Sequence, residues 1–560
     1  MEEYLSPGVY VEEYDNSPRA MEGVGTSTAG FVGLAEKGAA GGAPCLVANV
    51  AEFGRRYGGS LSGFTHGEYR YLSYAVEQFF QNGGTRCYVS RVIPADARKA
   101  SGEAGALTVE AANEGSWGNK IRLEVKAALR RKLQLLERKG EKTYIVKAAN
   151  GFEAGNIVKA GNCYNRIASV FEKEATFEEE FEEDMTDASL VPEKVLFIAE
   201  LDITVRCGDE MEIYEGMSLD PSSKDYVGTR MQGSELVKIT VSPGGGIVSP
   251  AEEITGEAEG IIALSGGTDG SMEQVDAGTF IGEDKGPGKR TGIQSFLENH
   301  SVSIMAVPGI TMPEVAASLI AHCENTASRF AVLDMPREMS GTKELLEYRE
   351  MFDSTYAAMY HPWVQQFDRS IKKPAYFPPS GAVMGVYART DVAKGVHKAP
   401  ANETLSCTGL SVSYTRAEQD ILNPAGVNLI RSIPGNGIRI WGARTASSSS
   451  SFRYVNVRRL FIYVEESIRA NTSWVVFEPN DASLWSRVRL TISGFLNDVW
   501  RAGMLAGASP QESYFVDIGP STMTQDDIRA GRLICNIGIA PSRPAEFVIF
   551  RVTQHTAGAE

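Results

Sequence analysis

Hydrophobic and polar positions follow two different periods within residues 26–93. The stretch TAGFVGLAEKG (28–38) is a short apolar run interrupted by glycines, which predicts a β-strand. Residues 67–84 predict a helix ending at a glycine pair, because apolar side chains recur there every three to four positions: Tyr71, Leu72, Ala75, Val76, Phe79 and Phe80. TRCYVSRVI (85–93) predicts a second strand, so this region reads as one α/β unit.

Residues 300–335 repeat this order of elements. SVSIMAVPG predicts a strand, TMPEVAASLIAHCEN a helix and RFAVLDMP another strand. Thr311 is the expected helix cap, and Pro313 lies in the first turn. Strand–helix–strand units with short connections predict parallel strands joined by right-handed crossovers. We therefore expect an α/β fold in which both units share one sheet.

Residues 101–255 change in character: they are charged and rich in strand-like stretches such as IRLEVKAAL and KTYIVKAAN. We interpret them as an inserted, solvent-facing, β-rich domain. Its acidic run EKEATFEEEFEED (172–184) lacks the D-x-D-x-D-G spacing of a calcium loop. A solvated surface is the simpler interpretation of that run, and cation binding is the alternative.

Two long amphipathic helices are predicted in the last part of the chain, over 454–470 and 481–504. Asn480 or Asp481 is the expected cap of the second helix. SWVVFEPN (473–480) and RLICNIGIAPS (532–542) predict strands, and the serine run 447–451 predicts a flexible loop.

Both ends of the chain predict extended segments. AEFVIFRVTQ (545–554) alternates as a strand, with Val548, Phe550 and Val552 on one face and Phe547 and Ile549 on the other. Near the start, Val9, Tyr10 and Val11 form a short strand-like stretch between prolines. Because an uncovered apolar strand invites pairing, the final strand either completes a sheet in its own domain or pairs with a neighbouring subunit.

These patterns divide the 560 residues into an N-terminal arm (1–25), a discontinuous core (26–100 and 256–370), the insertion (101–255), a C-terminal domain (371–544) and a terminal strand (545–560). Hydrophobic content is 43%, and we find no apolar run long enough to cross a membrane. The acidic N-terminus lacks the apolar stretch of a signal peptide, so we expect a cytoplasmic protein.

The seven cysteines are odd in number and form no C-x-x-C motif. This pattern favours a reducing compartment and disfavours both a disulfide framework and a structural zinc site. We therefore expect buried, inert thiols and no bound metal.

Net charge is −16 but is unevenly distributed. From residue 399 onward we count fifteen arginines, fourteen acids and no lysine, so this part carries about +1 and the remainder about −17. The acidic body disfavours nonspecific nucleic-acid binding. A region whose cations are all arginine suits ion pairs at interfaces, although codon bias or chance is the alternative explanation.

The sequence contains none of the catalytic motifs considered below. The chain has six histidines and lacks both H-E-x-x-H and G-x-S-x-G. GEDKGPGKRT (282–291) resembles a phosphate loop, but Glu283 and Arg290 occupy required positions. His322 and Cys323 are adjacent on a predicted helix and point about 100° apart. Asp334 follows a parallel strand but has no partner constellation, so we interpret it as structural. No enzymatic activity and no cofactor are expected.

Several stretches together resemble contractile tail sheath proteins. They are YLSPGVYVEE, GFVGLAEKG, FFQNGGTRCYVSRV, NEGSWGNKI, LSGGTDG, MYHPWV, FPPSGAVMGVYARTDVAKGVHKAPANETL and NGIRIWGARTASSSSSFRYVNVRRLFIYVEESI. The resemblance covers most of residues 4–100 and 255–555. Its last block, an Ile-Trp-Gly-Ala-Arg turn before the Val-Arg-Arg-Leu helix, is the most specific part. Residues 130–250 match nothing that we can place.

The resemblance implies a structural subunit that stacks in rings of six around an inner tube, with baseplate and tail-terminator proteins as further partners. It also implies that the two terminal segments add strands to the C-terminal sheet of neighbouring subunits, through Val9–Val11 and Phe547–Val552. Contraction of a metastable sheath would drive the tube forward without nucleotide hydrolysis, nucleic-acid binding or membrane insertion. Arg487, Arg489 and Arg501 are then candidates for contacts with the tube or with other subunits.

Two other classes remain as alternatives. Sheath cores have been compared with subtilisin-like folds, and GTSTAG (25–30) faintly resembles the serine motif of such a hydrolase, but no histidine precedes it. A non-contractile surface or binding protein is the second alternative. Two exchangeable terminal arms have no use in a simple binding module, so self-assembly into tubes would separate the classes.

Overall fold

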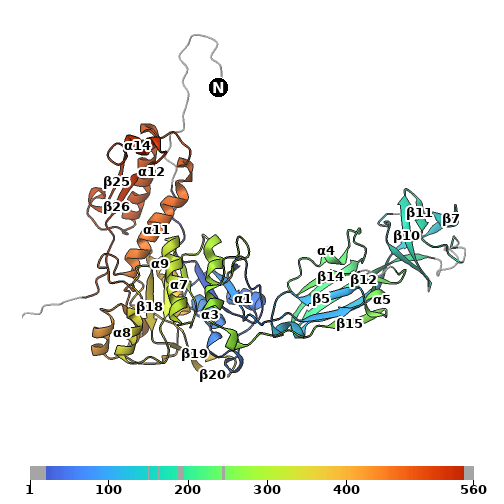
Figure 1. Ribbon diagram of the computed structural model, residues 1–560, viewed down its shortest axis with the longest axis horizontal. Helices are drawn as coiled ribbons and strands as arrows, with labels where there is room; N and C mark the ends of the chain where they lie inside the picture. The colour runs from blue at the N-terminus through green and yellow to red at the C-terminus, as the bar shows by residue number, and fades with distance from the viewer. Residues whose placement is uncertain are drawn as a thin grey trace, which may run out of the picture.

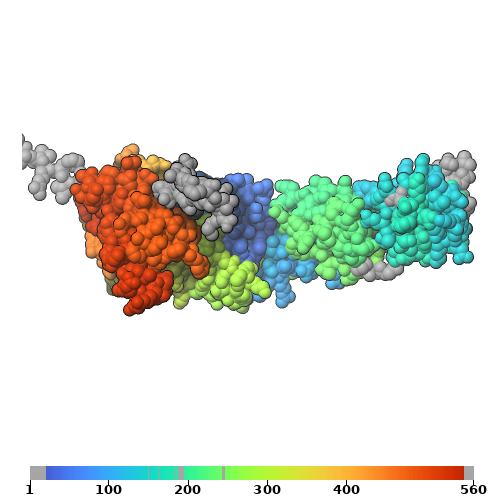
Figure 2. Space-filling view, turned by 90° about the horizontal axis from the view of Figure 1, so that it is seen from above, coloured from blue at the N-terminus to red at the C-terminus, as the bar shows by residue number. Residues whose placement is uncertain are grey.

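The computed structural model describes residues 21–148, 150–161, 163–182, 185–186, 195–242 and 246–547. The molecule is elongated (Figures 1 and 2). A core of strands and helices lies at one end, the C-terminal helices and hairpin rise from it, and the segment between residues 101 and 263 extends away from the core as two successive β-rich modules.

A nine-stranded sheet forms the centre of the core. Its order is β2-β3-β1-β16-β17-β18-β23-β24-β21, and the six strands from β3 to β23 are parallel. These six are Cys87–Val92, Ala29–Leu34, Ile304–Ala306, Phe330–Asp334, Ala357–His361 and Val427–Ile433. The remaining three are antiparallel additions at the two edges: Cys45–Val47 (β2), Gly437–Ile440 (β24) and Glu403–Thr404 (β21).

Helices cover both faces of this sheet. One face carries α1 (Val50–Tyr57), α3 (Leu72–Gln81) and α9 (Ser380–Lys394), and the other carries α6 (Ala277–Ile281), α7 (Pro313–Thr326), α8 (Thr342–Glu350) and α10 (Arg416–Leu422). Burial on both faces explains the almost wholly apolar central strands. Glycines let α9 approach α3 closely, since a Cβ at Gly381 would lie 2.2 Å from the Ala75 carbonyl oxygen.

The first module of the insertion packs one hydrophobic core between two sheets. A three-stranded sheet contains β4 (Ser101–Ala104), β5 (Leu107–Ala111) and β14 (Val237–Val241). The facing sheet contains β15 (Glu259–Ala263), β13 (Glu210–Met217) and parts of the two twelve-residue strands, β6 (Arg122–Leu133) and β12 (Leu196–Cys207). The helices α4 (Val227–Arg230) and α5 (Pro250–Thr255) close this module.

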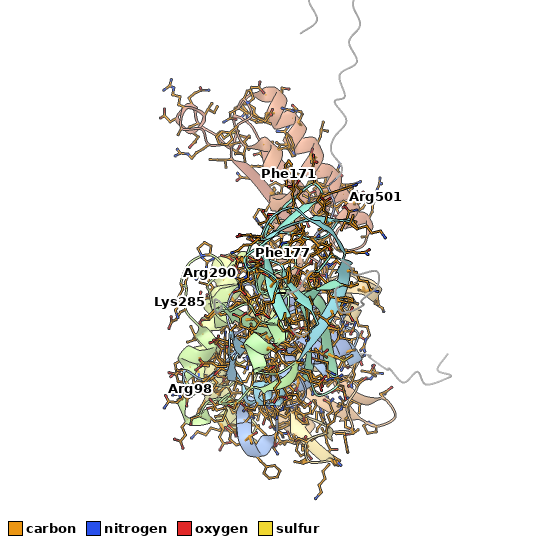
Figure 3. All side chains as sticks on the ribbon, turned by 90° about the vertical axis from the view of Figure 1, so that its right-hand side faces the viewer. Arg98, Phe171, Phe177, Lys285, Arg290 and Arg501 are labelled. Carbon is orange, nitrogen blue, oxygen red and sulfur yellow. The ribbon has the colours of Figure 1, made fainter. Side chains whose placement is uncertain are left out.

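The second, distal module continues from the far ends of β6 and β12. It adds β7 (Leu135–Arg138), β8 (Thr143–Val146), β9 (Ile157–Ala160), β10 (Cys163–Phe171) and β11 (Glu174–Phe177), which surround a separate hydrophobic core. Figure 3 looks onto this end of the molecule: Phe177 is buried in the core of the distal module, whereas Phe171 is 74% exposed.

A helical subdomain follows the core. It comprises α11 (Val455–Asn471), α12 (Ala482–Arg501), α13 (Pro510–Ser513), β25 (Tyr514–Ile518), α14 (Gln525–Arg529) and β26 (Cys535–Ile539). Shorter elements elsewhere are α2 (Gly63–His66), a small sheet of β19 (Val364–Asp368), β20 (Lys373–Phe377) and β22 (Gly409–Leu410), and 3-10 turns at 67–69, 116–120, 272–274, 292–298 and 473–475.

The expected mixed α/β class is confirmed, and the two strand–helix–strand units share one sheet. Three expectations were wrong in detail. Residues 473–480 form a 3-10 turn and loop, because Pro479 and the capped start of α12 end any strand there. Met312, not Thr311, precedes α7. The segment 380–440, expected in the C-terminal domain, supplies α9, β23 and β24 to the core, and β15 (259–263) belongs to the insertion.

Candidate assembly interface

The helical subdomain ends in a hairpin that has no third strand in the described part of the chain. Strands β25 and β26 pair antiparallel, with Tyr514 opposite Ile539 and Ile518 opposite Cys535. The pair rests on α12, where the hydroxyl of Tyr514 donates to the Ser493 carbonyl oxygen at 3.2 Å. Phe515 is 59% exposed. An isolated two-stranded sheet is marginal by itself and offers open edges for pairing.

Helix α12, the support of this hairpin, forms as the sequence predicts. Asp481 is its cap and accepts a hydrogen bond from the Leu484 amide at 2.9 Å. Its apolar stripe, including Val488, Ile492 and Phe495, packs against α11 residues such as Leu460 and Val464. The hairpin is therefore mounted on a rigid two-helix support.

The N-terminal root, residues 21–26, is fastened along α11. The Val24 amide donates to the Ser467 hydroxyl at 3.1 Å, and the Asn471 side chain donates to the Glu22 carbonyl oxygen at 2.9 Å. Gly23 packs against Tyr463 so closely that a Cβ would lie 2.0 Å from the phenol oxygen. The N-terminal root is therefore fixed to α11.

A buried ion pair holds the other end of this root. Arg459 of α11 donates to Asp391 of α9 at 2.6 and 3.0 Å and to the Thr26 carbonyl oxygen at 2.9 Å. The Thr26 hydroxyl donates to the same carboxylate at 2.6 Å. The guanidinium also lies over the Tyr387 ring. This cluster ties the core, α11 and the N-terminal root together.

The C-terminal root, residues 542–547, is anchored at Glu546. Its carboxylate accepts hydrogen bonds from Arg444 at 2.7 and 2.9 Å, from Asn423 at 2.7 Å and from Tyr454 at 2.8 Å. Burial alone would raise the pKa of Glu546, but these donors outweigh burial and hold the pKa below its ordinary value.

The two roots engage the same helix near its opposite ends. Tyr454 immediately precedes α11, and Ser467 and Asn471 lie in its last turns. Sequence reasoning missed these anchors. The available signal was the four arginines and the tyrosine within 444–459, a stretch that the resemblance singled out without assigning contacts.

The predicted strand residues lie mostly outside the described residues. This applies to Val9, Tyr10, Val11, Val548, Ile549, Phe550 and Val552. Phe547 is described; it is 73% exposed and is not assigned to a strand.

The three predicted contact arginines of α12 differ in their surroundings. Arg487 pairs with Glu478 at 2.9 Å and lies over the Trp474 ring, and Arg489 donates to the Ile518 carbonyl oxygen. Arg501 is exposed at the end of α12 (Figure 3). Arg501 is thus the one whose guanidinium is most available to another chain.

The groups considered for chemistry have structural surroundings. Asp334 accepts from the Ser380 amide at 2.8 Å, the Ser380 hydroxyl at 2.6 Å and the Gly309 amide at 2.9 Å, and burial raises its pKa to about 6. It joins the end of β17 to the start of α9 and to the loop after β16.

The two helix neighbours do not act together. His322 contacts Arg329 at 2.9 Å, and burial together with that cation lowers the pKa of His322 to about 3. Burial raises the pKa of Cys323 to about 12. A neutral imidazole and a protonated thiol on different faces of α7 form no nucleophile–base pair.

Charged side chains of the loop 282–291 form ion pairs within the loop and with Glu298. Arg290 pairs with Asp284 at 2.8 Å and with Glu298, and Lys285 pairs with Glu283 at 2.8 Å. Lys285 and Arg290 lie on one side of the molecule (Figure 3). Among the described residues, no group of three or more histidine, cysteine or acidic side chains could hold a metal ion, and no helix is long and apolar enough to cross a membrane.

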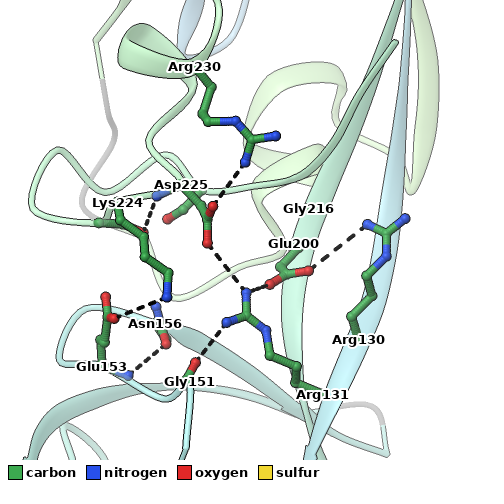
Figure 4. A network of polar contacts seen from close by, with 12 residues as sticks. Arg130, Arg131, Gly151, Glu153, Asn156, Glu200, Gly216, Lys224, Asp225 and Arg230 are labelled. Atoms are coloured by element: carbon green, nitrogen blue, oxygen red, sulfur yellow. Dashed lines mark hydrogen bonds and ion pairs between the residues drawn. The ribbon is translucent and has the colours of Figure 1, made fainter.

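A polar network joins the two modules of the insertion (Figure 4). Arg131 of β6 binds the buried Glu200, the Gly151 carbonyl oxygen at 2.9 Å and Asp225 at 3.6 Å. Arg130 pairs with Asp202 at 2.5 Å, and Lys224 with Glu153 at 3.7 Å. Gly151 and Glu153 belong to the distal module and Asp225 and Lys224 to the first one, so the network links them beside the shared strands.

Comparison with known proteins decides the family. A model of the phage tail sheath protein central domain matches residues 286–446, and a model of the phage tail sheath C-terminal domain matches residues 447–555. The chain belongs to the contractile tail sheath family. Both anchored roots, α11, α12 and the hairpin are therefore parts of a structural sheath subunit.

The chain is also similar to individual sheath proteins. A protein named as a prophage major tail sheath protein of Pseudomonas aeruginosa strain UCBPP-PA14 is 26% identical over 55% of this chain and 81% of its own length. The tail sheath protein of Escherichia phage P2 is 25% identical over 49% and 69%. The sheath of the extracellular contractile injection system PVC in its contracted state shares the fold, with 20% identity, 99% coverage of each chain and a TM-score of 0.55.

Proposed function

We propose that this sheath subunit assembles in the cytoplasm into stacked rings of six around an inner tube, joined through strands that neighbouring subunits add to the β25–β26 hairpin. The observation that carries this proposal is the two-stranded sheet, which has no third strand among residues 21–547 as described. Main-chain hydrogen bonds from an added strand would satisfy its open edges. The added strands are Val9–Val11 of one neighbour and Phe547–Val552 of another.

The anchored roots support this proposal. A strand donated to another subunit transmits force only if its attachment to its own subunit holds. The contacts of Val24 and Thr26 fix the N-terminal root to α11, and the contact of Glu546 with Tyr454 fixes the C-terminal root at the residue that precedes α11. Each subunit therefore has a rigid body, an acceptor hairpin and two firmly attached donor segments.

Contraction then requires two arrangements of the same linked subunits. The extended arrangement is metastable, and a signal from the baseplate releases it ring by ring. Differences in buried surface between the arrangements supply the free energy, without nucleotide hydrolysis. Arg501, and less directly Arg487 and Arg489, would contact the tube or other subunits. The insertion extends away from the core and would face outward (Figure 1). A terminator protein would close the far end.

Truncation tests the proposal in the full-length protein. We would compare tube formation, by electron microscopy and sedimentation, for the wild type, a variant lacking 548–560 and a control lacking only 556–560. Loss of tubes in the first truncation and not in the control is expected. Tubes from both variants would contradict strand donation by the C-terminal segment. Absence of tubes from the wild type, even with tube protein added, would contradict the sheath assembly itself.

A further inference from the structure

A groove of about 990 Å³ lies beside the C-terminal root. The root itself, Ser542–Phe547, forms one wall, and the segment 394–402, α10, Arg431 and Trp441 are among the residues that line the other parts. Ser542 follows the end of β26 at Ile539 by only three residues. The groove therefore opens close to the hairpin that we propose as the strand acceptor.

The lining of this groove is basic, in contrast to the net charge of −16 for the whole chain. Its charged side chains are five cations and two acids: Lys394, Lys398, Arg416, Arg431, Arg543, Asp420 and Glu546. Glu546 is already engaged by Arg444, and Lys398 pairs with Glu403 at 3.5 Å.

Four of these cations, Lys394, Arg416, Arg431 and Arg543, lack a carboxylate partner within the described ranges. Arg416 and Arg543 are exposed and form no ion pair there, and Arg431 binds only the Gln419 side chain and the Tyr414 carbonyl oxygen. Guanidinium groups in this state suit bidentate contacts with carboxylates of another chain.

We propose that this groove binds the acidic side chains of the N-terminal segment of a neighbouring copy. Residues 1–20 carry five acids and one arginine: Glu2, Glu3, Glu12, Glu13, Asp15 and Arg19. The C-terminal segment 548–560 is not complementary, since Arg551 and Glu560 cancel. Charge therefore selects the N-terminal segment as the occupant.

The spacing along the chain fits this arrangement, which rests on the proposed strand exchange. Glu12, Glu13 and Asp15 directly follow the strand residues Val9–Val11. An extended chain advances roughly 3.3–3.6 Å per residue, so acids one to four residues beyond a strand on the hairpin reach about 13 Å past it. The groove sets the register of the added strand, because the carboxylates pair only when the strand is correctly placed.

Charge exchange in the full-length protein tests the groove. We would measure the critical concentration for tube formation by sedimentation. The groove variant is Arg416→Glu/Arg543→Glu, and its control is Lys285→Glu/Lys343→Glu. A combined variant carries the groove substitutions together with Glu12→Lys/Glu13→Lys. We expect an increase of at least tenfold in the groove variant, no more than a twofold change in the control, and recovery to within threefold in the combined variant.

The opposite partner gives a second test that leaves the folded body unchanged. Glu12→Gln/Glu13→Gln/Asp15→Asn should also raise the critical concentration at least fivefold, and the increase should shrink in 0.5 M salt, where exposed charges are screened. An unchanged critical concentration in this variant or in the groove variant overturns the groove. A failure to recover in the combined variant also overturns it.

Deletion of residues 1–20 separates the two proposals. If the deletion abolishes tubes while the groove and arm charge variants assemble normally, the groove is wrong and strand exchange stands. If the deletion leaves assembly unchanged, exchange of the N-terminal segment is wrong and the groove loses its occupant as well. Binding can also be measured directly. We expect a fluorescent peptide of residues 1–20 to bind the wild type, and we expect Arg416→Glu/Arg543→Glu to weaken that binding at least tenfold.

Discussion

The guanidinium of Arg459 lies 2.6 Å from a carboxylate oxygen of Asp391, and both side chains are at most 4% exposed. Thr26 binds the same pair through its hydroxyl and its carbonyl oxygen. The ion pair therefore joins a core helix, the helix that leads to the hairpin and the root of the N-terminal segment. A buried pair of this kind is costly to break, because the remaining charge has no water to solvate it.

Removing one partner of this pair should destabilise the core strongly. We expect Arg459→Met to lower the free energy of unfolding of the core transition in urea by about 3–5 kcal/mol. The matched change Lys343→Met, in the exposed pair with Glu347, should alter it by less than about 0.5 kcal/mol. Equal effects of the two substitutions would show that the Arg459–Asp391 pair has no special role.

The Glu546 anchor should control detachment of the C-terminal root. Glu546→Ala removes hydrogen bonds from Arg444, Asn423 and Tyr454, each of the charged kind worth about 1.5–3 kcal/mol. We expect chymotryptic cleavage after Phe547 to become roughly tenfold or more faster, since cleavage follows local opening. The exposed change Glu338→Ala serves as control. Unchanged cleavage in Glu546→Ala would mean that the root is held by other contacts.

Asp334 should make core stability depend on pH. Its pKa is raised to about 6 in the folded protein, against about 3.9 in an unfolded chain. The folded state therefore binds the proton more tightly, so this contribution is present below about pH 4 and is lost as the pH rises through 6. The unfolding free energy of the wild type minus that of Asp334→Asn should fall by about 2 kcal/mol from pH 4.5 to 7.5. A flat difference for Asp334→Asn over this pH range would show that burial does not raise the pKa of this carboxyl in solution.

The network around Glu200 should fix the distal module on the first one. The side chain of Glu200 is 4% exposed and forms an ion pair with Arg131. Arg131→Met leaves this carboxylate without its main partner, so we expect faster hydrogen exchange over residues 150–161, roughly tenfold. The neighbouring exposed change Lys132→Met should have little effect. Equal exchange in the two variants would contradict a connecting role for Arg131.

The sequence predicts elements well where one physical signal dominates. The helix over 482–501 follows from its apolar stripe and the Asp481 cap, and the central strands follow from short apolar runs between helices. The stretch 473–480 misled because Val475, Val476 and Phe477 look strand-like, although residues 473–475 form a 3-10 turn and Phe477 has a φ of 67°, outside the strand region. Which sheet β23 would join depends on contacts far away in the chain, which periodicity cannot reveal.

The assembly surfaces were less accessible to sequence reasoning. A strand over 545–554 stays a prediction from alternation, whereas the anchor at Glu546 depends on Asn423, Arg444 and Tyr454, which lie 92 to 123 residues away. Arg487 and Arg489 were candidates for contacts with other chains, and within the subunit Arg487 donates to Glu478 and Arg489 to the Ile518 carbonyl oxygen. Side-chain partners across elements are a property of the folded chain and leave no local pattern.

A helical reconstruction of the assembled protein by electron cryo-microscopy tests the central claim most directly. The account predicts a four-stranded sheet at each hairpin, in which β25 and β26 of one subunit are flanked by residues 9–11 of a second subunit and residues 547–552 of a third. A hairpin with free edges, or one flanked by the terminal segments of its own subunit, would contradict it.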